Sequence, residues 1–200
     1  MADAAFEEHD LGISWLPDPG EVMQRACHAV RLGGSRRVWI IDPVDVAGLD
    51  ERIESLAAGA GIAGVIQLLD RHTRDCVRLA ERHHRLPFAA IAGSGLESVK
   101  LLDTPVWREV AIFSPADRAL IVPEAVGTAP YFRAGSEPVG IHPMLRLTPP
   151  RRLAAYQPEH LLTGHGTGMH GPGTAAALSD ALAGSRRRIP AALVSIAKRR

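Results

Sequence analysis

Three polar positions follow runs of apolar residues and carry side chains suited to chemistry. The segment 70–75 (Asp-Arg-His-Thr-Arg-Asp) follows the apolar run 62–69, Glu124 follows a strand-like run, and His165 lies in a Gly- and Thr-rich segment after two leucines. Carboxylates and imidazoles are the groups that most often transfer protons and bind metal ions. Because sites in α/β proteins form where the strands of a sheet end, these positions are candidates for one site.

The first half of the chain alternates between apolar runs of strand length and segments with helical periodicity. Across 44–60, apolar residues recur every three or four positions, the spacing of one face of a helix. The pattern predicts strands over 38–41, 62–69 and 87–90, and helices over 44–60 and 76–84. This alternation is typical of layered α/β proteins.

The second half contains a predicted hairpin, a long loop and two helices. Two β-rich runs, 110–113 and 119–122, flank a short polar turn, which is the pattern of a hairpin. Residues 127–152 are rich in Gly, Pro and Arg, so we expect a loop that borders a pocket. Helices are expected over 174–182 and over 190–198.

The composition predicts a globular domain without a charged partner. The chain has 200 residues, and 23 Lys and Arg nearly balance 22 Asp and Glu, for a net charge of +1. Such a balance creates no field that would attract nucleic acid or an anionic membrane, and we expect neither as a partner. The basic runs at 186–188 and 198–200 are interpreted as solvated. The length favours a single domain.

The cysteines and the N-terminus favour a cytoplasmic location. Cys27 and Cys76 are too few and too far apart in the sequence for a disulfide framework, which favours a reducing compartment. The acidic N-terminal residues do not resemble a secretory signal, and no apolar run approaches the roughly 18 residues of a membrane span.

Three segments, in this order, resemble the metallo-β-lactamase superfamily. Residues 39–43 (WIIDP) are similar to its early strand that ends in Asp, 118–126 (RALIVPEAV) to the strand that delivers a bridging carboxylate, and 161–166 (LLTGHG) to its late Gly-His-Gly. The similarity covers about residues 30–183. It implies an αβ/βα four-layer sandwich in one domain over 1–200, with both ends of the chain packed on the core.

The signature loop of that superfamily, HxHxDH, is changed in this chain. An alignment without gaps places Arg71, Thr73, Asp75 and Cys76 on its four ligand positions, and Trp107 at or beside the position of a further histidine. A one-residue shift with a gap would instead place Asp70 and His72 on the first two positions. His142, in the long loop, is expected to border the same pocket.

The resemblance therefore implies at most one retained metal ion. Arg71, Thr73 and Trp107 are not suitable zinc ligands, so the first metal position of the family should be lost. The second position could still hold one zinc or iron ion through oxygen, sulfur and nitrogen donors. Its expected ligands are Asp75, Cys76, Glu124 and His165, of which Asp75 and His165 would also be catalytic.

Two functions remain open on this basis. The first is a divergent hydrolase acting on an unknown small molecule without dinuclear zinc chemistry; the superfamily cleaves lactams, thioesters and phosphodiesters, and a fold does not select among them. The second is a non-catalytic pseudoenzyme or binding protein in which Arg71 is salt-bridged to Asp75 and Glu124 in place of the metal. A homodimer is compatible with either.

Overall fold

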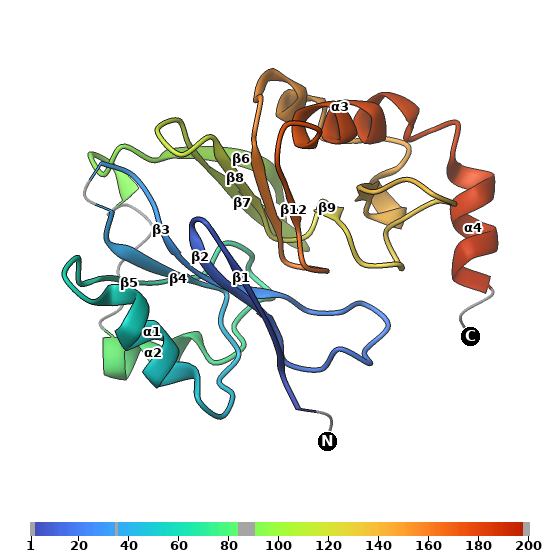
Figure 1. Cartoon of the computed structure of the whole chain (residues 1–200). Coiled ribbons are helices and arrows are strands. Elements are labelled where there is room, and N and C mark those ends of the chain that lie inside the picture. Colours follow the sequence, from blue (N-terminus) through green and yellow to red (C-terminus); the bar gives the residue numbers. More distant parts are fainter. Residues whose placement is uncertain (1–2, 35, 84–90, 198–200) are drawn as a thin grey trace.

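Two five-stranded sheets pack face to face in the computed structural model, which describes residues 3–34, 36–83 and 91–197 (Figure 1). The first sheet follows the chain order, and only its last two strands are parallel. Its strands are β1 (Ala5–His9), β2 (Gly12–Leu16), β3 (Cys27–Arg31), β4 (Val38–Ile41) and β5 (Ile62–Ile66).

The second sheet has the order β12-β11-β8-β7-β6, and only β8 and β11 run parallel to each other. Its strands are β6 (Glu97–Thr104), β7 (Trp107–Ser114), β8 (Ala119–Val122), β11 (His160–Thr163) and β12 (Met169–His170). A small separate pair consists of β9 (Val126–Gly127) and β10 (Gly140–Ile141).

Helices cover the outer face of each sheet. Helices α1 (Leu49–Ala57) and α2 (Cys76–His83) pack on the first sheet, and α3 (Thr174–Gly184) packs on the second together with the 3-10 helix η3 (Arg151–Ala155) (Figure 1). A further 3-10 helix, η2 (Pro143–Leu145), and the helix α4 (Ile189–Ala197) complete the elements. The layers therefore have the expected αβ/βα order.

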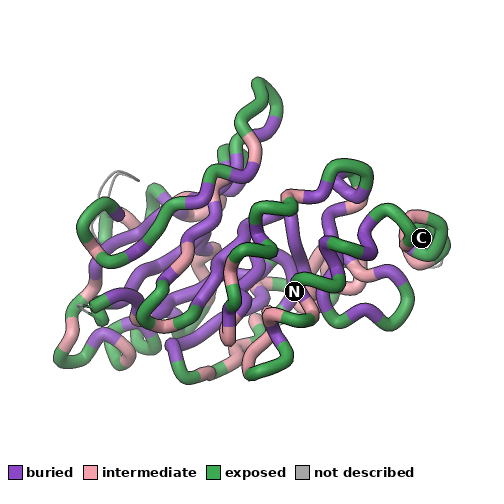
Figure 2. The backbone as a smooth tube through the Cα atoms, turned by 90° about the horizontal axis from the view of Figure 1, so that it is seen from above, coloured by how far each residue is buried: buried purple, intermediate pink, exposed green. Residues whose placement is uncertain are grey.

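Side chains point alternately to the two faces of each strand, and the buried ones form three hydrophobic clusters: one between the sheets and one beneath the helices on each outer face. In β4, Trp39 and Ile41 point between the sheets, whereas Val38 and Ile40 point toward α1 and α2. This follows from the two-residue side-chain period of a strand. Both faces of the central strands are buried, which explains why their sequences read as continuous apolar runs (Figure 2).

Several predicted elements match and others do not. The strand 38–41 and the hairpin around 115–118 are present, but α1 begins at Leu49 because the preceding residues form an extended segment. Trp15 Nε1 donates to the carbonyl of Val44 at 2.9 Å and holds that segment. The sequence did not predict β1, β2, β3, β6 or β12, and the expected strand 87–90 lies outside the described residues.

The loops that follow the parallel strands meet at one edge of the sandwich. Gly164, directly after β11, lies so close to the loop after β8 that a Cβ on it would be 2.0 Å from the carbonyl oxygen of Pro123. Only glycine permits this approach. At the same edge, isolated β-bridges join Arg25 to His165 in a neighbouring loop and Leu69 to Glu109 on β7.

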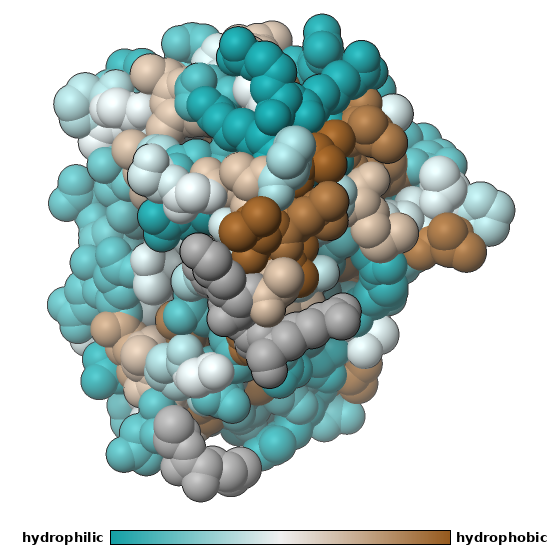
Figure 3. Space-filling view, turned by 90° about the vertical axis from the view of Figure 1, so that its right-hand side faces the viewer, coloured by the Kyte–Doolittle hydropathy of each residue, from teal (hydrophilic) through white to brown (hydrophobic). Residues whose placement is uncertain are grey.

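Helix α4 differs from the others because it contributes little to the core. Among its described residues only Ala192 is buried, whereas Leu193 and Val194 are 62% and 54% exposed. Figure 3 views the molecule from the side on which α4 lies and shows a group of hydrophobic side chains there. In the described part of the chain, no helix combines the length and the apolar character needed to cross a membrane.

Candidate metal centre

Two imidazoles and one carboxylate converge at this edge. The Nε2 atoms of His72 and His165 lie 3.2 and 3.1 Å from the same oxygen, Oε2 of Glu124. His72 comes from the loop between β5 and α2, Glu124 from the exit of β8, and His165 from the exit of β11. All three side chains are buried, and they form the one group within the described ranges whose ligand atoms all lie within 4.8 Å of one another.

Both imidazoles are held by their second ring nitrogen. His72 Nδ1–H donates to Asp42 Oδ2 at 2.9 Å, and His165 Nδ1–H donates to the carbonyl of Met23 at 3.0 Å. In the neutral form each ring then directs the lone pair of Nε2 toward Glu124. Histidines that bind metal ions are commonly oriented in this way, by a carboxylate or a backbone carbonyl on the other nitrogen.

Asp42 is itself fixed at the end of β4. Its second oxygen, Oδ1, accepts the backbone N–H of Leu68 at 2.8 Å, and its side chain is buried. Its φ of 45° lies in the left-handed region, which is uncommon for a residue other than glycine but is best tolerated by Asp and Asn. Strain of this kind is often found at functional sites, because the surrounding structure must maintain it.

The carboxylate of Glu124 is stabilised in its charged form. Burial alone would raise its pKa, but hydrogen bonds from His165 and His72 lower the pKa well below the ordinary value. For His72, burial lowers the pKa, and the hydrogen bonds to Asp42 and Glu124 outweigh that effect and raise it. The centre therefore favours positive charge beside Glu124.

His142 approaches the other oxygen of Glu124. Its Nε2 lies 3.4 Å from Oε1, and its Nδ1 accepts the backbone N–H of Met144 at 3.3 Å. The ring is neutral at pH 7, because burial lowers its pKa to about 4. It stands edge-on to Trp107 with ring centres 4.9 Å apart. His142 thus presents a neutral N–H to the carboxylate, and the expectation that it borders the site agrees with its position.

A buried glutamate positions the Glu124 loop. Glu109 Oε1 accepts the backbone N–H groups of Glu124 and Ala125 at 2.9 and 2.7 Å, and Oε2 accepts Trp107 Nε1–H at 2.8 Å. Burial raises the pKa of Glu109 to about 7. The sequence prediction missed this residue, although Glu109 is in phase with the buried Trp107 and Ala111 on β7, which is an unusual position for a charged side chain.

An arginine that the sequence prediction did not select reaches the centre. Arg74 Nη2 lies 3.2 Å from His72 Nε2, and Nη1 donates to the carbonyls of Ala26 and Asp42 at 2.7 and 2.8 Å. Its Nε is buried and has no hydrogen-bond partner. A guanidinium therefore contacts one of the three donors directly.

The structure corrects the expected ligand set from the gap-free alignment. Asp75 Oδ2 accepts the backbone N–H of Asp45 at 2.8 Å, and Cys76 is buried in the core beneath α2, where its Sγ donates to the carbonyl of His72 at 3.4 Å. Neither belongs to the convergent group of Glu124 and His165. The physical reason is that α2 begins at Cys76, which turns both side chains away from the sheet edge.

The remaining predicted pocket residues occupy the rim or lie outside it. The guanidinium of Arg71 lies 4.5 Å from the centre of the Trp107 ring, and among the described ion pairs none joins Arg71 to Asp75 or Glu124. The proposed Arg71 salt bridge is therefore wrong, and Arg74 is the arginine at the centre. Thr73 is exposed at the start of α2, its carbonyl accepting the backbone N–H of Cys76.

The shifted alignment is half correct. It places His72 in the centre, but the exposed Asp70 accepts the backbone N–H of Arg108 at 3.1 Å and is not part of the donor group.

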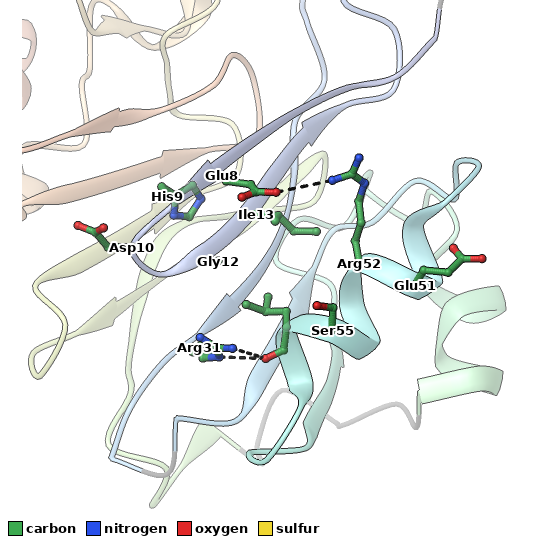
Figure 4. A pocket seen from close by; sticks show the side chains of 10 residues that line it. Glu8, His9, Asp10, Gly12, Ile13, Arg31, Glu51, Arg52 and Ser55 are labelled. Carbon is green, nitrogen blue, oxygen red and sulfur yellow. Dashed lines mark hydrogen bonds and ion pairs between the residues drawn. The ribbon is translucent and has the colours of Figure 1, made fainter.

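A separate cavity of about 410 Å³ lies on the far side of the first sheet, between the β1–β2 turn and α1 (Figure 4). Three of its charged side chains, Glu8, Arg31 and Arg52, have partners within the protein. Arg31 donates to the carbonyl of Leu56, and Arg52 pairs with Glu8 at 3.8 Å. This cavity does not include any of the three donors.

No protein-family model and no curated protein matches the chain by sequence, whereas solved structures do match its fold. The metallo-β-lactamase DIM-1 aligns with a TM-score of 0.52 at 11% identity, covering 96% of this chain and 98% of its own. TTHA1623 in a di-iron-bound form aligns at 0.54 and 17%, covering 83% and 95%. A fragment (1–254) of diflavin flavoprotein A 5 from Nostoc sp. PCC 7120 aligns at 0.55 and 13%, covering 98% of each chain.

These similarities establish the fold at low sequence identity. The chain has the metallo-β-lactamase fold, as the three sequence segments predicted, and its sequence is only 11 to 17% identical to these proteins. The convergent donors lie where loops meet at the edge of the two sheets, and their types suit a metal ion.

Proposed function

We propose that the chain binds one zinc or iron ion through His72, Glu124 and His165 and is a mononuclear metal-dependent hydrolase of a small molecule. One observation carries the proposal: two imidazole nitrogens, both fixed by their Nδ1 hydrogen bonds, point at the same carboxylate oxygen from 3.2 and 3.1 Å. Two lone pairs facing an ionised carboxylate repel it unless a proton or a metal cation lies between them. Two nitrogens and one oxygen are a donor set that zinc and iron accept.

Three protein donors would leave a coordination position for water or substrate. Held by the three side chains, the ion would act as a Lewis acid. It would polarise a substrate oxygen or lower the pKa of a water molecule at the open position. The protein's own part is orientation. Asp42 and the carbonyl of Met23 keep the imidazoles in the ligating tautomer, and His142 donates toward Oε1 of Glu124 so that Oε2 faces the histidines.

A single ion fits the chain better than a pair. Among the described residues one group of three donors converges, His72, Glu124 and His165. A second ion would need further carboxylates or imidazoles beside them, and the nearby Arg71 and Arg74 cannot ligate. We therefore propose chemistry that requires one ion.

Metal content of purified protein tests the proposal. After reconstitution with zinc or iron(II) and removal of loosely bound ions, the wild type should retain about one ion per chain, and His165→Ala should retain almost none. His83→Asn, a histidine on α2 paired with Asp50 and outside the centre, is the matched control and should behave as wild type. Turnover of a lactam, a thioester or a phosphodiester that depends on the added metal and disappears in His165→Ala would support hydrolysis.

A second function is favoured by one specific contact. Arg74 Nη2 lies 3.2 Å from His72 Nε2, so the guanidinium could serve as the resident cation of a metal-free binding protein. In that case wild-type protein would retain no metal at any tested concentration, and zinc would not raise its unfolding temperature. The same reconstitution experiment therefore separates the two functions.

A further inference from the structure

We infer that Arg74 is a built-in competitor of the metal ion, so that the centre alternates between a form closed by the guanidinium and a metal-bound form from which Arg74 has withdrawn. This inference rests on the proposed metal binding and concerns its regulation. It assigns to Arg74 a role that is neither ligation nor catalysis.

The competition follows from the number of lone pairs on one atom. His72 donates its Nδ1 proton to Asp42, so a neutral ring has a single lone pair, on Nε2. Arg74 Nη2–H, at 3.2 Å, points its donor at that same nitrogen. An sp² nitrogen cannot accept a hydrogen bond from a guanidinium and ligate a metal ion with one lone pair. Either partner must therefore displace the other.

Charge leads to the same conclusion. The carboxylates of Asp42 and Glu124 both contact His72, and their two negative charges match the charge of one divalent ion. Holding both a divalent ion and Arg74 would leave the buried centre with an excess positive charge. Unbalanced charge in a buried site is strongly unfavourable.

The arginine is well anchored and yet able to leave. Nη1 is held by the carbonyls of Ala26 and Asp42, but Nε is buried without a partner and the residue as a whole is only partly buried. Its backbone has a φ of 38°, in the left-handed region that disfavours residues with a Cβ. Withdrawal would free the orphaned Nε to reach water, in exchange for the contacts to the carbonyls of Ala26, Asp42 and Gly164.

The dissociation constant for zinc, measured by competition with a chelator, tests the inference. Arg74→Met should bind zinc about ten- to a hundredfold more tightly than the wild type, because the competing cation is gone. Arg74→Lys, which keeps the charge but loses the planar pair of donors, should lie between them. Arg71→Met is the matched control: it removes an arginine from the same loop whose guanidinium lies over Trp107, and its affinity should stay within about threefold of wild type.

Unfolding temperature provides a second readout that does not depend on activity. Without metal, Arg74→Met should unfold at a lower temperature than the wild type, because the contacts to Ala26 and Asp42 are lost. With saturating zinc the order should reverse. If Arg74→Met is too unstable to purify, the zinc dissociation constant and the unfolding temperature are both measured on Arg74→Lys. Its dissociation constant for zinc should be lower than that of the wild type.

The outcomes distinguish this inference from the proposed function. Equal or weaker zinc binding by Arg74→Met, with tight binding by the wild type, overturns the inference and leaves the metal site intact. Absence of binding by the wild type and by both Arg74 variants overturns both. Zinc binding by Arg74→Met alone supports the competition and shows that the wild type is the metal-free form.

Discussion

Two groups of histidines in this molecule differ in their electrostatic surroundings: one faces a carboxylate, and in the other the imidazoles face one another. The first group, around Glu124, contains His72, His142 and His165, whose Nε2 atoms all approach the carboxylate. The second group contains His9, His160 and His170, at the end of β1 and on β11 and β12. In it the rings of His9 and His170 stack with centres 4.5 Å apart, and the Nδ1 atoms of His160 and His170 lie 2.9 Å apart.

Among the residues that the structure describes, no carboxylate hydrogen-bonds to the second group, and Asp10 acts on His9 and His170 only through its charge. Burial and the neighbouring histidines lower the pKa of His9 to about 4, and burial and His160 lower the pKa of His170. His9 Nδ1 and His170 Nε2 are buried without partners. Converging imidazoles therefore do not make a cation site by themselves. An acceptor on Nδ1 and a carboxylate that faces Nε2 are also needed, and in the first group His72 and His165 have both.

Removing the carboxylate from the first group should have the largest effect. Glu124→Ala deletes the group that all three histidines face, and zinc affinity should fall at least about a hundredfold. In metal-free protein the free energy of unfolding should fall by about 3 kcal/mol, the lower end for a broken buried ion pair. Chelator competition and urea unfolding in EDTA measure the two effects.

The control for this change is Glu159→Ala. Glu159 pairs with Arg118 at 2.5 Å on the surface, where its side chain is 45% exposed, and its loss should change stability by less than about 1 kcal/mol. Equal zinc affinity in Glu124→Ala and the wild type would remove the distinction between the two histidine groups.

Loss of orientation should have the next largest effect. Asp42→Asn keeps the size, but its single side-chain oxygen cannot accept from both Leu68 N–H and His72 Nδ1–H. If that oxygen stays on Leu68, an amide N–H faces His72 Nδ1 in place of an acceptor. Zinc affinity should fall about ten- to a hundredfold. Since Asn also tolerates a positive φ, the strained backbone at this position should be retained. An unchanged dissociation constant would indicate that His72 does not ligate.

The neutral histidines should make stability depend on pH. His28 is fully buried, accepts from Ser14 Oγ at 2.7 Å, donates to the carbonyl of Thr163, and has a pKa lowered by burial to about 3. In the unfolded chain its pKa returns to about 6.5, so the unfolded state binds more protons below that pH and stability falls on acidification. The loss at pH 5 relative to pH 7.5 should be about 2 kcal/mol.

His28→Gln isolates this contribution. A glutamine can both accept and donate but does not titrate, so the difference between urea unfolding at pH 5 and at pH 7.5 should shrink by about 2 kcal/mol. An identical pH profile in His28→Gln and the wild type would show that His28 is not buried in its neutral form.

Much of the fold was predictable because it is local, whereas the ligand set was not. The strand 38–41 matches β4 because a strand buried on both faces has a distinct apolar run. By contrast, β3 (Cys-His-Ala-Val-Arg) carries His28, whose partners Ser14 and Thr163 lie far away in the sequence. Nothing in the local pattern indicates that such a histidine is satisfied in the core.

The site was half predictable for a related reason. Glu124 and His165 were selected from strand ends that the resemblance aligned, and they do converge. Between Asp70 and Cys76, however, a shift of one residue decides which side chains face inward. That shift is set by where α2 begins and by Asp42, which binds His72 across 30 positions of the sequence. Without knowing which residues of this loop face inward, the sequence could not identify Arg74 as the arginine at the centre.

The smallest effect is expected at the second histidine group, where His170→Asn should leave zinc content unchanged. The substitution removes a ring whose Nε2 has no partner and whose main contacts are the stack on His9 and the short Nδ1 contact with His160. Losing an aromatic stack and one neutral hydrogen bond, while removing an unsatisfied nitrogen, should change the free energy of unfolding by less than about 1 kcal/mol. Metal analysis of His170→Asn beside His165→Ala makes the comparison direct. Loss of metal from His170→Asn would mean that imidazoles without a hydrogen-bonded carboxylate can hold an ion in this protein after all.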